Sequence, residues 1–169
     1  MPMKKSFALV FALAFALVLS GVALAYPGGG TASQTVSFEV TPIHAIAVSG
    51  DPAPLVINTA SAGSEPDDAI DSSTTYSFTT NYRGSVILAS LDSDMPYGVT
   101  LSVELAVPTG YGVPEGYVPL SGSGQPVVFA LDAGCWSGLA IGYKLHAPAE
   151  AGYNGSDSRT VTFTLMGEL

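Results

Sequence analysis

The chain has 169 residues, one cysteine, and five lysine or arginine residues against fourteen aspartate and glutamate residues, for a net charge of −9. This acidic composition argues against binding to nucleic-acid backbones, which requires clustered cations, and a single cysteine excludes a disulfide within the chain. The length suits one folded domain behind a targeting segment.

Residues 1–25, MPMKKSFALVFALAFALVLSGVALA, have the order of a secretory signal peptide. Lys4 and Lys5 precede a long apolar run, and the small residues Ala23 and Ala25 follow it. We expect a signal-peptide helix that is cleaved after Ala25, so that the mature protein is secreted to the extracellular space or cell surface and keeps no membrane segment. The alternative is an uncleaved membrane anchor, because the apolar run approaches the length that spans a bilayer.

The mature chain is predicted to begin with a flexible leader and a strand. The leader, residues 26–33, is YPGGGTAS, which is rich in glycine and small residues. Residues 34–40, QTVSFEV, then place Val36, Phe38 and Val40 on one face, with polar residues between them. Alternation at period two is typical of a strand with one buried face.

The same signature recurs along the rest of the chain. Further strands are expected at residues 43–50, 54–58, 74–80, 84–91, 98–107, 126–132 and 139–147, and a final strand carries Val161, Phe163 and Leu165. An exposed loop is expected at 59–73, and a Pro, Gly and Tyr rich excursion at 108–124. No helix start with 3.6-residue spacing follows the signal peptide. Residues 34–169 are therefore predicted to form an all-β domain, an immunoglobulin-like or jelly-roll β-sandwich of eight or nine antiparallel strands.

Residues suited to catalysis are few. His44 lies in an expected strand, and His146 lies on the outward phase of another. The favoured interpretation of each is a histidine in a strand that has its hydrogen bonds satisfied or is exposed to solvent, without a catalytic role. No nucleophile elbow, zinc-protease, phosphate-loop or dinucleotide motif occurs. Cys135, beside Trp136, is interpreted as a small buried hydrophobe, with pairing between subunits as the minority alternative. The protein is therefore predicted not to be an enzyme.

The densest acidic cluster is a candidate metal site. Glu65, Asp67, Asp68 and Asp71 fall close together in SEPDDAIDSS, and calcium prefers many oxygen ligands. The spacing differs from an EF-hand loop, and a solvated acidic loop that keeps the protein soluble is the favoured interpretation. No cofactor other than calcium is expected.

Two tyrosines of the 108–124 excursion are candidate ligand contacts. The aromatic faces of Tyr111 and Tyr117 could stack on sugars or pack into a partner. They could equally pin the excursion to its own sheet, which is the favoured interpretation.

The terminal strands carry few of the residues that protect sheet edges from pairing. Soluble sandwiches usually place lysine, proline or inward charges at such edges, but the strands with Val36, Phe38 and Val40, or with Val161, Phe163 and Leu165, are uninterrupted. A strand on a glycine tether can complete its own sheet or that of a neighbouring molecule.

With its signal peptide, small-residue leader, terminal alternating strands and lysine-poor body, the chain resembles the secreted β-sandwich subunits of prokaryotic surface fibres, namely the donor-strand pilins and the TasA-like or spore-coat-like matrix proteins. The paired cysteines of many chaperone-assembled pilins are missing. The resemblance implies a structural or adhesive surface protein that assembles by β-strand addition with itself or with other surface proteins. The alternative is an extracellular module that binds glycans or calcium.

Overall fold

The computed structural model describes residues 30–167. The predicted signal-peptide helix and the first half of the leader, residues 26–29, lie outside these residues. Within the described part of the chain, no helix is long and apolar enough to cross a membrane.

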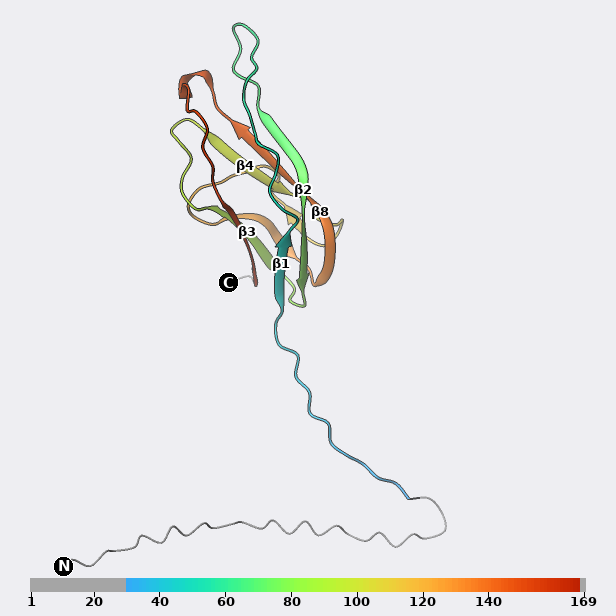
Figure 1. The fold of residues 1–169 in the computed structure, drawn as a ribbon. Coiled ribbons are helices and arrows are strands. Elements are labelled where there is room, and N and C mark those ends of the chain that lie inside the picture. The colour runs from blue at the N-terminus through green and yellow to red at the C-terminus, as the bar shows by residue number, and fades with distance from the viewer. Residues whose placement is uncertain (1–29, 168–169) are drawn as a thin grey trace, which may run out of the picture. The chain divides into compact units, whose positions relative to one another are not determined.

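Nearly all of the regular secondary structure in the described chain is β-strand (Figure 1). The strands are β1 (His44–Val48), β2 (Ala69–Thr80), β3 (Ser85–Leu91), β4 (Thr100–Leu105), β5 (Val113–Pro114), β6 (Val118–Pro119), β7 (Gln125–Leu131), β8 (Gly134–His146) and β9 (Val161–Gly167). Besides these, residues 30–167 contain one short 3₁₀ turn, Ala149–Ala151. The prediction of an all-β fold is confirmed.

The strands form two antiparallel sheets. One has the order β1-β2-β8-β4-β6 and the other β5-β7-β3-β9. From β2 to β9, each successive strand belongs to the sheet opposite to that of the strand before it, so only β1 and β2 are sequential neighbours in one sheet. The dark red strand β9 runs alongside β3 in Figure 1, although the two are far apart in sequence.

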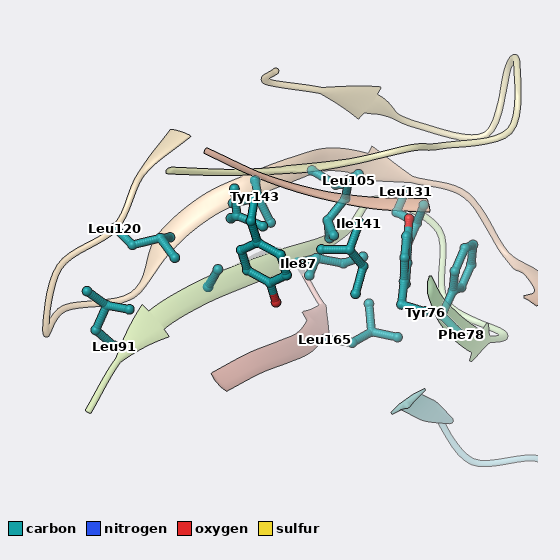
Figure 2. Close-up of a cluster of buried hydrophobic side chains, with 14 of the residues drawn as sticks. Tyr76, Phe78, Ile87, Leu91, Leu105, Leu120, Leu131, Ile141, Tyr143 and Leu165 are labelled. Atoms are coloured by element: carbon teal, nitrogen blue, oxygen red, sulfur yellow. The ribbon is translucent and has the colours of Figure 1, made fainter. Parts of the chain in front are cut away.

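The two sheets share one hydrophobic core. Figure 2 shows Ile87 of β3 and Leu165 of β9 pointing toward Ile141 and Tyr143 of β8. Core-facing and outward-facing side chains alternate along a strand, because the pleat turns successive side chains to opposite faces. In β3, for example, every second residue from Ser85 to Leu91 is buried.

Two of the expected strands are not strands in the structure, and β2 begins earlier than expected. Residues 34–40 and 54–58 lie outside all nine strands, and β2 starts at Ala69, inside the loop predicted for 59–73. The reason for the early start is backbone pairing. Ala69 pairs with Leu145 of β8, so hydrogen bonding to a long neighbour extends a strand whose side chains here are mostly polar.

Candidate functional site: the free sheet edges

The C-terminal strand β9 is an edge strand docked in its own sheet. It pairs with β3 along its full length, from Val161 opposite Leu91 to Gly167 opposite Ser85. Because directly opposed residues of an antiparallel pair share a face, Val161, Phe163 and Leu165 all face the core. The predicted alternation is therefore present. The strand has a partner on one side and none, among the described strands, on the other.

The unpaired side of β9 presents the backbone groups of its core-facing residues. The Asp92 N–H donates to Thr160 O at 3.0 Å, which marks this pair as hydrogen-bonded. Bonded pairs recur at every second position of an antiparallel ladder. The N–H and C=O groups of Val161, Phe163 and Leu165 consequently point away from β3, toward the free side.

Strand β1 is the edge of the other sheet, and its free side has the same character. The Ser49 N–H donates to Thr75 O at 2.8 Å, so the alternation leaves the backbone groups of His44, Ile46 and Val48 pointing away from β2.

The core-facing side chains of β1 are poorly covered. Ile46 lies opposite Phe78, and Val48 lies opposite Tyr76. Phe78 and Tyr76 are 2% and 1% exposed, whereas Ile46 is only partly buried and Val48 is 51% exposed. These apolar side chains face the core but remain partly in water. Covering them with another strand would therefore be favourable.

The core-facing side chains of β9 show the same contrast. Phe163 and Val161 are only partly buried, whereas Ala89 and Leu91, the residues opposite them on β3, are almost fully buried. Cα atoms of β1 and β9 come within 8 Å of each other. The two free edges therefore flank one side of the two-sheet body, and that side is incompletely covered. We call it the β1–β9 side.

The opposite side of the body is protected. There the edges are β6 and β5, each only two residues long and each containing a proline, Pro119 and Pro114. Proline has no N–H to donate, and short proline-containing edges deter further pairing. In contrast, β1 and β9 contain neither proline nor lysine.

Segment 34–40 is described by the structure and belongs to no strand. Its three large apolar side chains are exposed to water: Val36 is 69%, Phe38 91% and Val40 78% exposed. Isolated exposed apolar residues are normal on a protein surface. Three at alternate positions form one continuous apolar face when the segment is extended.

The chain immediately before β1 is held by a residue that the sequence analysis missed. The Asn81 side chain accepts from the Ile43 N–H at 2.7 Å and donates to Thr41 O at 2.9 Å. Pro42, between these two residues, fixes its own φ. No local pattern indicates this role, because the partners of Asn81 lie about forty positions earlier in the sequence.

Tyr111 and Tyr117 both pack against their own domain. The ring of Tyr111 meets Trp136 edge-on, with 4.9 Å between ring centroids. Tyr117 lies beneath the Lys144 ammonium, 4.9 Å from the ring centroid. Burial, followed by the charge of Glu104 and a hydrogen bond to it, raises the pKa of Tyr117. These contacts match the interpretation in which the tyrosines pin the excursion to the sheet.

The acidic residues of the loop before β2, and Asp71 near the start of β2, bind groups of the same chain. Glu65 accepts from the Ala149 N–H at 2.6 Å, and Asp68 lies 2.7 Å from Nδ1 of His146. Asp68 therefore ties this loop to the end of β8, and Glu65 ties it to the segment that follows β8.

The other two acids have local partners. Asp67 accepts from the Thr59 hydroxyl at 2.9 Å, and Asp71 accepts from the Ser73 hydroxyl and N–H. Within residues 30–167, no group of three or more His, Cys, Asp or Glu is arranged so that it could hold a metal ion.

Cys135 is exposed, which corrects the interpretation of it as a buried hydrophobe. Its position in the ladder explains why. Cys135 pairs with Thr79, and on either side of Thr79 the residues Phe78 and Thr80 are buried. Thr79 and Cys135 therefore both point to the outer face of the sheet.

Comparison with protein-family models, curated proteins and solved structures finds no match. The feature of this chain that bears most directly on function is the asymmetry between its open β1–β9 side and its protected opposite side.

Proposed function

We propose that the protein is a secreted, non-enzymatic structural or adhesive subunit of a cell-surface or extracellular fibre or matrix, which assembles by β-strand addition. The observation that carries the proposal is segment 34–40, whose alternating apolar side chains are exposed, in a chain that also has free, unprotected strand edges. Main-chain hydrogen bonds would supply attraction between subunits, and burial of the apolar face would supply most of the stability.

For the fold we favour a jelly roll over an immunoglobulin-like sandwich. Successive strands from β2 onward alternate between the sheets, and the long strand β8 pairs with β2 near the start of the domain. Crossing between sheets at every connection, with an early and a late strand side by side, is the pattern of a strand pair rolled around a barrel-like core.

Secretion is supported by the signal-peptide pattern of residues 1–25.

The test is assembly of the exported chain, followed by negative-stain electron microscopy and light scattering. Wild type is expected to form elongated particles. The triple variant Val36→Ser, Phe38→Ser, Val40→Ser should remain monomeric, because it loses the apolar face. Its melting temperature as a monomer should match that of the wild-type monomer, since all three side chains are exposed in the structure.

The matched control replaces the alternate residues of the same segment. Thr35→Ala with Ser37→Ala leaves the apolar face intact, so assembly should persist. Wild-type protein that stays monomeric at high concentration would contradict the proposal. So would a triple variant that assembles normally or that fails to fold.

A glycan- or calcium-binding module is not favoured, since the tyrosines and acids predicted to serve it contact groups of their own chain. The same preparation distinguishes it. A rise in melting temperature on adding calcium, or heat of binding to glycans in calorimetry, would favour the binding module.

A further inference from the structure

We propose that the acceptor of segment 34–40 is the free edge of β9 in a second copy of this chain, with Val36, Phe38 and Val40 turned inward over the β1–β9 side. This inference rests on the proposed function and specifies its partner and its site. The donor segment would become the fifth strand of this sheet, in the order β5-β7-β3-β9-donor.

Length and backbone geometry favour β9 over the other edges. Segment 34–40 has seven residues, and β9 also has seven, whereas β1 has five and β5 and β6 have two each. The free N–H and C=O groups of β9 belong to Val161, Phe163 and Leu165, as the Asp92–Thr160 hydrogen bond shows. A donor paired with these groups continues the sheet without displacing any existing bond.

The side chains on the two faces of such a pair are complementary. Inward, the donor's apolar residues would cover Phe163, which is only partly buried, and Val48, which is 51% exposed. Outward, Thr35 and Ser37 of the donor would lie beside Thr162 and Thr164 of β9. Hydroxyl pairs of this kind are favourable between neighbouring strands.

Charge also favours this edge. The chain carries fourteen acidic residues, yet β1 and β9 contain none and segment 34–40 contains one, Glu39. Glu39 falls on the outward, solvated phase of the donor. Two copies of an acidic protein can therefore meet here with a single carboxylate, that of Glu39, on the solvated face of the contact.

The chain's own segment is a poorer occupant than that of a second copy. Asn81 holds Thr41 and Ile43 in line with β1, and Pro42 between them cannot adopt the positive φ that the tightest hairpin turns require. A reversal onto the same molecule would have to occur within residues 34–40, and would consume the residues that the pairing needs. A second copy has no such restriction.

Disulfide trapping tests the site, in a Cys135→Ser background and with the exported chain. One preparation carries a mass tag and Ser37→Cys. It is mixed with an untagged preparation that carries Thr162→Cys or Thr164→Cys on β9. These positions lie between the bonded pairs of the proposed ladder, where Cα atoms are closest and a disulfide fits. The matched control carries Ala45→Cys or Ala47→Cys on the outer face of β1.

The expected result is a heterodimer of intermediate mass that forms with one of the β9 variants, disappears on reduction and does not form with the β1 variants. Trapping with β1 instead, or with neither edge while assembly still requires Val36, Phe38 and Val40, would overturn the β9 site but keep strand addition. A Ser37→Cys, Thr164→Cys double variant that closes only within one chain would overturn the second copy as occupant. Wild-type protein that stays monomeric at all concentrations would contradict the proposed function as well as the β9 site.

Discussion

The side-chain oxygen of Asn81 accepts a hydrogen bond from the backbone N–H of Ile43 at 2.7 Å. With the bond from its side-chain nitrogen to Thr41 O, this amide continues the β1–β2 ladder one step beyond the strand. The folded body therefore takes hold of the chain just after segment 34–40, and Asn81 marks that boundary.

Replacing Asn81 should loosen this boundary. Asn81→Ala removes both bonds and is expected to lower the free energy of unfolding by about 1 kcal/mol and the melting temperature by roughly 3 °C. The Ile43 amide should exchange faster with deuterium. Asn81→Asp is the control, because it keeps the acceptor for Ile43 but loses the donor to Thr41. Unchanged exchange at Ile43 in Asn81→Ala would contradict this role.

Substitutions at Leu165 and Thr164 test which face of β9 packs against the core. Leu165 is 8% exposed and faces the core, while Thr164 is exposed on the outer face. Leu165→Ala should lower the free energy of unfolding by about 2–3 kcal/mol, because it leaves a cavity. Thr164→Ala should change it by less than about 0.5 kcal/mol. Chemical denaturation of the monomer measures both, and equal effects would show that β9 is not docked as described.

The body should lose stability in alkali. Burial, with smaller contributions from the charges of Asp51 and Asp71, raises the pKa of Tyr143 from 10.0 to about 12. Because the folded pKa is the higher, the stability that this group contributes is fully present below pH 10 and is lost as the pH rises toward 12. The loss amounts to roughly 2–3 kcal/mol.

The free energy of unfolding of Tyr143→Phe should therefore fall less steeply with pH in alkali than that of wild type. Circular dichroism and tyrosinate absorbance measure the transition. Tyr153→Phe is the control, because Tyr153 is 98% exposed. Identical alkaline profiles for wild type and Tyr143→Phe would contradict the assignment.

The Cys135 thiol should be reactive in the native state. It is exposed on the outer face of the sheet, so a thiol reagent should titrate one group per chain without denaturant. Cys135→Ser should change the free energy of unfolding by less than about 0.5 kcal/mol, which makes it a suitable background for the trapping experiment. A thiol that reacts only after unfolding would restore the interpretation of a buried cysteine.

The sequence predicted the strands whose side chains alternate against a core. The strand predicted at 84–91 and the final strand predicted to carry Val161, Phe163 and Leu165 coincide closely with β3 and β9, because the pleat imposes period two locally. Residues 69–73 were assigned to a loop because their side chains are polar, and pairing with β8 overrides that composition. The same limit explains Cys135, whose outward direction follows from its partner Thr79 and not from its apolar neighbours.

Composition and periodicity alone determined that this is an acidic chain, all-β after its N-terminal apolar segment, with apolar alternation at residues 34–40 and again at Val161, Phe163 and Leu165. Only the tertiary structure decided that the two ends differ, since β9 is bonded to β3 whereas the equally alternating segment 34–40 lies outside every strand. Alternation states which face of a strand is apolar. Which strand gains a neighbour depends on backbone groups that are distant in sequence, and these are brought together only when the two sheets close over their core.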